Sequence, residues 1–341
     1  MIVNFDEYPR LKIGLFPTPL QPLENLSNYL GGPKIWIKRD DLCGIAFGGN
    51  KIRKLEYILY DVIKAGYNTI VTAGGPQSNH TLLTAGSARK VGLDYRIIAL
   101  SQKPELITGN LVTHQIYRSK IVFREIEPSK SWGETALSVY KEIKKELEKE
   151  NKKPVYIPVG GSIPVGALGY CRCVYEIKEQ SQNYGFVPSF FVLTSGSMGT
   201  ITGIILGKKL FKMNFNITGI SVFGKDEYLT LGVNRIEENV VKAGKLLDFD
   251  IECSEKDYTI FYDYTGPGYG SVTPECVEAI KITARTEGII LGPVYSGKAM
   301  AGLIDLIKKG YFNKKDNVVF LHSGGSSEIF AKYGEMVPYL D

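Results

Sequence analysis

The sequence is short of the residues that build metal and redox sites. It has only 3 histidines in 341 residues, which argues against a His-rich metal site. Its 5 cysteines are odd in number and scattered. Cys171 and Cys173 are too close in the chain to suit a disulfide or a zinc knuckle. We therefore expect no metal, and reduced thiols of the kind found in a cytoplasmic protein.

Long apolar runs and charge of a single sign are also lacking. No run reaches membrane-spanning length, and the chain does not start with a basic stretch followed by a long apolar segment. The net charge of +5 is a small difference between 41 basic and 36 acidic residues. These charges alternate, most densely at 142–153. We expect no membrane span and no nucleic-acid partner, whereas a small anionic ligand would suit the charge surplus.

The chain does contain a regular alternation of short apolar runs and amphipathic stretches. Its length exceeds that of most single hydrophobic cores, so two domains are expected. The predicted strands are Lys34–Lys38, Thr69–Ala73, Tyr95–Leu100, Ile121–Ile126, Val155–Val159, Phe190–Thr194, Ile217–Val222 and Asn317–His322. Helical patterns lie between them, for example at Ile52–Ala65, Asn79–Val91, Glu134–Lys149, Met198–Leu210 and Pro274–Glu287. This order predicts an α/β protein with open parallel sheets covered by helices.

Glycine-rich turns follow several of the predicted strands. They are Ala73–Pro76, Val159–Ser162, Thr194–Gly199 and Ser323–Ser326. Glycines in such turns can simply let the chain reverse direction. Ligands of open α/β sheets, however, bind at the carboxyl ends of the strands. We therefore expect these turns to meet in one cleft.

The turn Thr194–Thr200 has the composition of a phosphate-binding loop. It follows an apolar strand, precedes a helical pattern, and consists of small residues whose backbone N–H groups can face an anion. It lacks the Gly-Lys-Ser/Thr of a P-loop and the Gly-x-Gly-x-x-Gly dinucleotide spacing. The candidate phosphate-binding residues are Gly196, Ser197, Met198, Gly199 and Thr200.

Lys51 is the most informative single residue. It follows Gly48-Gly49 and opens a stretch of helical apolar period. At a helix entrance the positive end of the dipole favours the neutral amine, and a neutral amine can attack an aldehyde. This setting suits Schiff-base chemistry with pyridoxal phosphate, PLP. An ordinary solvated lysine on an amphipathic helix is the alternative.

Several motifs resemble those of fold-type II PLP enzymes. The early ones are Ile35–Leu42, Phe47–Lys51 and Gln77–His80, and the later ones, Gly266–Gly270, Arg285–Gly288, Gly292–Ala299 and His322–Gly325, are similar to the branch containing 1-aminocyclopropane-1-carboxylate (ACC) deaminase and D-cysteine desulfhydrase. The resemblance covers nearly the whole chain. It implies a tryptophan synthase β-like fold, with a large PLP-binding domain of residues 1–54 plus 161–341 and a small inserted α/β domain of residues 55–160. It also implies a homodimer.

The resemblance assigns roles to five polar residues near the first motifs. Lys51 would carry the cofactor, and Lys54 would reach its phosphate. Asn79 would contact the 3′-oxygen of the cofactor and the substrate, although the residue could equally be a helix N-cap. Ser78 would meet the substrate carboxylate and take part in attack or proton transfer. His80 is kept with the substrate-binding candidates, although it has no clear role and a structural histidine is the simpler interpretation.

The resemblance also places two tyrosines and two serines at the active site. The ring of Tyr295 would lie against the pyridine, and the hydroxyls of Tyr269 and Tyr295 would exchange protons near the substrate. Ser296 and Ser323 would lie at the cofactor. ACC deaminases typically have glutamate and leucine there. A carboxylate at the pyridine nitrogen would strengthen the electron sink that ACC, without a hydrogen on Cα, requires. The hydroxyl pair therefore resembles the desulfhydrase pattern.

The sequence thus predicts a PLP-dependent lyase that eliminates sulfide from D-cysteine and yields pyruvate and ammonia. ACC deaminase, L-cysteine or L-cysteate lyase, and elimination from D-serine or β-chloroalanine are alternatives. A rival from another class is a non-catalytic α/β protein that binds a phosphorylated metabolite. It would need the Thr194–Thr200 loop but not Lys51 or the tyrosines.

Overall fold

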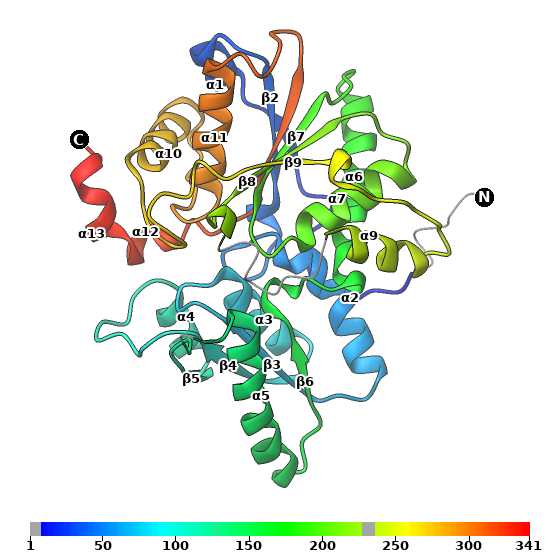
Figure 1. Cartoon of the computed structure of the whole chain (residues 1–341), viewed down its shortest axis with the longest axis vertical. Coiled ribbons are helices and arrows are strands. Elements are labelled where there is room, and N and C mark those ends of the chain that lie inside the picture. Colours follow the sequence, from blue (N-terminus) through cyan, green and yellow to red (C-terminus); the bar gives the residue numbers. More distant parts are fainter. Residues whose placement is uncertain (1–7, 128, 227–235) are drawn as a thin grey trace.

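The computed structural model describes residues 8–127, 129–226 and 236–341, and it contains two β-sheets in separate lobes (Figure 1). The larger sheet has six strands in the order β1-β2-β10-β7-β8-β9, and the smaller has four in the order β5-β4-β3-β6. Every neighbouring pair is parallel except β1 and β2. The predicted α/β class is confirmed. Residues 1–7 of the expected large domain lie outside the described residues.

All eight predicted strands are present, with ends shifted by a few residues. The strands are β1 (Leu20–Pro22), β2 (Lys34–Arg39), β3 (Thr69–Gly74), β4 (Asp94–Ala99), β5 (Lys120–Phe123), β6 (Pro154–Ile157), β7 (Phe190–Ser195), β8 (Asn216–Ser221), β9 (Thr259–Phe261) and β10 (Asn317–His322). The two unpredicted strands, β1 and β9, have 3 residues each and lie at the sheet edges. They are too short to show a periodic pattern. The antiparallel β1 departs from the purely parallel sheet that we expected.

The five predicted helices are also present. The helices are α1 (Glu24–Leu30), α2 (Lys51–Lys64), α3 (Asn79–Lys90), α4 (Asn110–Ile116), α5 (Trp132–Lys149), α6 (Pro164–Asn183), α7 (Gly199–Leu210), α9 (Ile236–Lys245), α10 (Pro274–Glu287), α11 (Ser296–Lys308), α12 (Glu328–Ala331) and α13 (Tyr333–Met336). Helix α5 begins two residues before the predicted Glu134, because Ser131 and Glu134 form a capping box around its first turn.

Helices cover both faces of each sheet, so the central strands are apolar on both sides. One face of the larger sheet packs against α1, α10 and α11, and the other packs against α6 and α7. In the smaller sheet α2 and α3 cover one face and α5 covers the other. Helix α2 also packs against α6, so it lies between the two lobes (Figure 1).

The strands of the smaller sheet, together with α3, α4 and α5, all come from residues 69–157. The domain boundaries at residues 55 and 160 stay a prediction. In the described part of the chain, no helix combines the length and apolar character needed to cross a membrane. All five cysteines are free thiols.

Candidate active site

A cavity of about 300 Å³ lies between the two lobes. Its wall includes residues from all four glycine-rich turns: Gly74 and Gly75, Val159, Gly160 and Ser162, Thr194 to Met198, and Ser323 and Gly324. These turns follow β3, β6, β7 and β10. The predicted meeting of the turns in one cleft is therefore confirmed. Parallel strands explain it, because their carboxyl ends face the same side.

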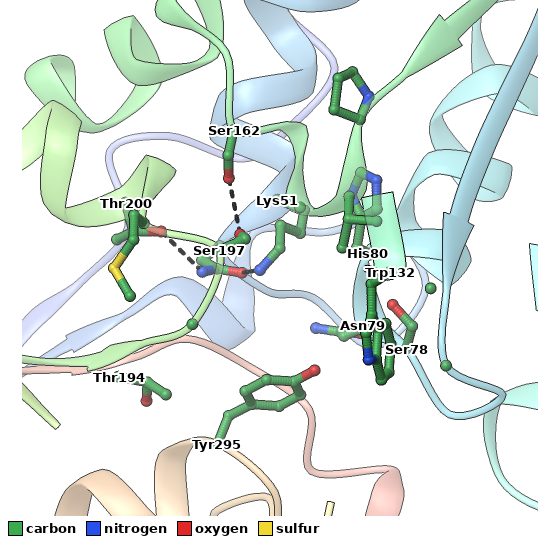
Figure 2. A pocket seen from close by; sticks show the side chains of 18 of the residues that line it. Lys51, Ser78, Asn79, His80, Trp132, Ser162, Thr194, Ser197, Thr200 and Tyr295 are labelled. Atoms are coloured by element: carbon green, nitrogen blue, oxygen red, sulfur yellow. Dashed lines mark hydrogen bonds between the residues drawn. The ribbon is translucent and has the colours of Figure 1, made fainter. Parts of the chain in front are cut away.

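Lys51 is the first residue of α2, as expected, and its side chain enters the cavity (Figure 2). The turn before it requires glycine: Gly48 has a φ of +70°, and a Cβ there would lie 1.8 Å from the carbonyl oxygen of Asp41. The ammonium donates to Asn50 Oδ1 at 2.7 Å. Burial lowers the Lys51 pKa to about 8, and the charge of Glu328 opposes this shift. The neutral amine is thus favoured mainly by burial, whereas we had expected the helix dipole to favour it.

A buried ion network fixes α2 against the larger lobe. The guanidinium of Arg53 donates to Asp40 and to Glu176, with bonds of 2.8–2.9 Å. Lys38 pairs with the same glutamate at 2.8 Å. Burial alone would raise the Glu176 pKa, yet Arg53 and Lys38 hold it at about 2. Lys38 and Asp40 belong to the Ile35–Leu42 motif, so this motif orients the helix that carries Lys51.

The predicted phosphate loop leads into α7. Met198 occupies the left-handed region, with a φ of +63°, and the helix begins at Gly199. The Gly199 N–H and the Ser162 hydroxyl meet at 3.2 Å, and that hydroxyl donates to Ser197 Oγ at 2.8 Å. Behind the loop, Lys54 donates to the Gly160 carbonyl at 3.0 Å. Burial and the charge of Lys51 lower the Lys54 pKa.

This loop has the chemistry that a phosphate requires. A 12-residue helix points its N-terminus at the cavity, and a buried lysine lies directly behind it. A Cβ on Gly199 would come within 2.9 Å of Lys54 Nζ, whereas a Cβ on Gly196 would meet nothing closer than 3.5 Å. Gly196 thus leaves open space at the cavity, and Gly199 allows close packing of the loop against Lys54.

The residues of the Gln77–His80 motif line the opposite side of the cavity (Figure 2). Ser78 is the N-cap of α3, accepting from the Thr81 N–H at 3.4 Å. The suggested alternative of Asn79 as the cap is therefore wrong. Asn79 Nδ2 donates to the Gly48 carbonyl at 3.3 Å, and its Oδ1 is buried with no partner among the described residues. An unpaired buried amide oxygen fits a wall that faces a polar ligand.

His80 has a structural partner and one ring nitrogen to spare. Thr72 Oγ1 lies 2.8 Å from His80 Nε2 and donates to the Ile157 carbonyl at 2.7 Å. Since that hydroxyl proton is already used, the Nε2–H donates to Thr72. Nδ1 is buried with no partner in the described part of the chain. Burial and the charges of Lys51 and Lys54 lower the His80 pKa, so the ring is neutral.

The two predicted tyrosines meet at the cavity. The hydroxyls of Tyr269 and Tyr295 share a hydrogen bond. Tyr269 stacks on Phe223, with ring centroids 4.6 Å apart and planes inclined by 8°, and the ring of Trp132 meets it edge-on at 5.3 Å. Burial and the neighbouring Tyr269 raise the Tyr295 pKa. Both hydroxyls therefore stay protonated near neutral pH, and each can pass a proton to the other.

The two serines that distinguish the branches lie differently. Ser323 lines the cavity. Ser296 is fully buried behind the wall, where its hydroxyl accepts from the Gly292 N–H at 2.8 Å and donates to the Gly324 carbonyl at 3.4 Å. Lys54 and Gly199 also lie behind the lining. The candidates that do line the cavity are Lys51, Ser78, Asn79, His80, Gly196, Ser197, Met198, Thr200, Tyr269, Tyr295 and Ser323.

Four neighbours of the site were not anticipated from the sequence. Asn50, Trp132 and Phe223 line the cavity, and Glu328 is a buried carboxyl whose oxygens have no hydrogen-bond partner among the described residues. A signal exists for Trp132, because it follows the capping serine Ser131 at the start of a helix. Phe223 and Glu328 carry none, because nothing local distinguishes them from ordinary core or surface residues.

Comparison with known proteins identifies the family. The chain matches the family model described as "Pyridoxal-phosphate dependent enzyme" over residues 11–324. It therefore belongs to the PLP-dependent enzymes, and within them to the ACC deaminase and D-cysteine desulfhydrase family of lyases. This membership removes the basis for the non-catalytic alternative.

Relatives of both kinds match nearly the whole chain. A provisionally named ACC deaminase of Pyrococcus furiosus is 38% identical over 97% of this chain and 96% of the relative. A D-cysteine desulfhydrase of Yersinia enterocolitica is 36% identical over 97% and 98%. The crystal structure of an ACC deaminase homologue superimposes with a TM-score of 0.87, at 35% identity and 98% coverage of both chains. These identities are too similar to separate the two activities.

Proposed function

We propose that the protein catalyses β-elimination of D-cysteine, with pyruvate, sulfide and ammonia as products. The observation that carries the proposal is the charge of the cavity. Among the described lining residues, Lys51 is the only side chain of a type that is charged at neutral pH. The second lysine, Lys54, lies behind the phosphate loop. The wall therefore suits a substrate with one carboxylate and a neutral side chain, such as cysteine.

The same observation separates cysteine from two alternatives. A sulfonate side chain, as in L-cysteate, would need a second cation at the far end of the substrate, and the described lining offers none. ACC requires a strong electron sink, and this chain has the hydroxyls of Ser296 and Ser323 where deaminases typically have glutamate and leucine. A cysteine thiol has a pKa of about 8.5 and leaves more readily than an alcohol, which favours it over D-serine.

The chain's own residues divide the work as follows. PLP, when bound, supplies an aldehyde that captures amines and a ring that accepts electrons. Lys51, with its pKa near 8, can hold or release a proton at Nζ and is the candidate base for the Cα proton. Ser78 and the N-terminus of α3 are placed to hold the substrate carboxylate. The paired hydroxyls of Tyr269 and Tyr295 can move a proton beside the leaving group.

The decisive experiment measures sulfide, pyruvate and ammonia from D-cysteine, L-cysteine, L-cysteate and ACC in parallel, with one preparation of the holoenzyme. We expect sulfide and pyruvate in equal amounts from D-cysteine and little product from ACC or L-cysteate. Faster turnover of L-cysteine would reverse the assigned handedness, and efficient ammonia release from ACC would overturn the substrate while leaving the PLP chemistry intact.

A further inference from the structure

The ring of Tyr269 is held by aromatic contacts more than by its own backbone. Its loop contains Gly268 and Gly270, and a Cβ built on either of them would meet no atom within 4 Å. The backbone is therefore loosely surrounded. Phe223 covers one face of the ring, and Trp132 touches the ring with its planes at 85°. These contacts direct the Tyr269 hydroxyl toward Tyr295.

The two aromatic neighbours come from different lobes. Phe223 follows β8 of the larger sheet. Trp132 is the first residue of α5, which packs on the smaller sheet, and the Ser131–Glu134 capping box fixes the start of that helix. The Trp132–Tyr269 contact therefore crosses the cavity from one lobe to the other. In Figure 2 Trp132 lies on the same side as Ser78 and Asn79.

We propose that Trp132 is a positioning residue: its indole, reaching across from the smaller lobe, sets the Tyr269 hydroxyl on Tyr295. The contact exists only while the two lobes are closed over the cavity, so the tyrosine pair is complete only in the closed enzyme. Opening the lobes removes one side of the clamp, and the hydroxyl then loses its fixed place. This role rests on the proposed elimination reaction, in which the tyrosine pair handles a proton.

A double-mutant cycle tests whether Trp132 acts through Tyr269. We expect Trp132→Ala to lower kcat about 10- to 100-fold, because a small displacement of a reacting group has effects of that size, and to change KM much less. Trp132→Phe, which keeps an aromatic edge, should restore most of kcat. Tyr269→Phe should be costly in the parent and nearly silent in the Trp132→Ala background. Independent, multiplying effects of the two substitutions would overturn the proposal.

A second measurement needs no substrate. The sequence has 2 tryptophans, and the other, Trp36, is stacked on Phe186 in the larger lobe. A Trp36→Phe holoenzyme therefore reports on Trp132 alone and should retain full activity. In that background Tyr269→Leu should increase quenching of Trp132 fluorescence by acrylamide, whereas Tyr269→Phe should not. Unchanged quenching in the leucine variant would show that the contact is absent in solution.

The two measurements separate this proposal from the substrate assignment. If D-cysteine is not turned over, the substrate assignment fails, and the cycle is repeated with whichever amino acid the parallel assay identifies. The quenching comparison is unaffected, because it uses no substrate. Protection of Trp132 by the Tyr269 ring together with a coupled cycle supports the positioning role, and the loss of either one contradicts it.

Discussion

Lys51 donates a hydrogen bond to the side-chain oxygen of Asn50 over 2.7 Å, and the amide group of the same asparagine donates to Thr200 Oγ1 at 3.2 Å. One side chain therefore ties the reactive lysine to the first turn of the phosphate loop's helix (Figure 2). The two ends of a bound PLP, its aldehyde and its phosphate, must meet these two residues at a fixed separation. Asn50 provides a direct link that maintains it.

The first prediction concerns the covalent lysine. Lys51→Ala should lower β-elimination by at least about a hundredfold, because the candidate base and amine is lost. PLP should still be retained in part through its phosphate. After borohydride reduction, mass spectrometry should find a pyridoxyl adduct on Lys51 in the parent and none in the variant. Lys64→Ala, at the exposed end of the same helix, is the matched control and should keep both adduct and activity. An adduct on Lys54 in the parent would refute the assignment.

The second prediction uses the contrast between two glycines of the phosphate loop. A Cβ on Gly199 would lie 2.7 Å from Ser162 Oγ and 2.8 Å from Ser162 Cα, whereas a Cβ on Gly196 would only make ordinary contacts. Gly199→Ala should therefore lower both the thermal midpoint and PLP retention. Gly196→Ala should fold normally and release PLP faster during dialysis, because its methyl group would enter the cavity. Equal PLP retention in Gly196→Ala and the parent would show that the phosphate binds elsewhere.

The third prediction concerns the pH dependence of stability. Burial raises the Glu328 pKa to about 8, whereas a glutamate in an unfolded chain titrates near ~4.3. Between these values the folded protein binds more protons than the unfolded chain, so stability falls as pH rises toward 8. Glu328→Gln removes this loss. The variant should gain stability over the parent between about pH 5 and pH 8.5, by on the order of a few kcal/mol.

Urea unfolding of the PLP-free proteins at both pH values checks this. Glu335→Gln, at a side chain 49% exposed in the neighbouring helix, is the control and should show no such gain. A difference that is constant with pH would mean that Glu328 is equally charged, or equally neutral, in the folded and unfolded proteins. The buried carboxyl would then have a partner that the structure does not include.

The sequence revealed the fold and much of the site because both depend on local patterns. The central strands are buried on both faces, so they appear as apolar runs, and Lys51 stands at a turn that only glycine can make. The contributions of Trp132 and Phe223 could not be predicted, because they depend on two lobes meeting across a cavity. The orphaned carboxyl of Glu328 is equally invisible, since burial at that position depends on packing around residues 292–296 and 323–325. The antiparallel β1 was missed because three residues show no period.

The last prediction tests the residues that distinguish the two branches of the family. Exchanging Ser296 and Ser323 together for Glu and Leu should depress sulfide release from D-cysteine. Ser296 is fully buried, and its hydroxyl both accepts and donates hydrogen bonds. A glutamate there would break those bonds and place a carboxyl beside the Gly324 carbonyl, where it would be costly to ionise. The paired Ser296→Ala and Ser323→Ala variants separate the loss of hydroxyls from the gain of charge. ACC turnover need not appear, because Ser78 and both tyrosines must also be placed correctly for that substrate. If the Glu/Leu variant released sulfide as fast as the parent, neither serine would determine the substrate, and the choice between cysteine and ACC would lie with the residues that line the cavity itself.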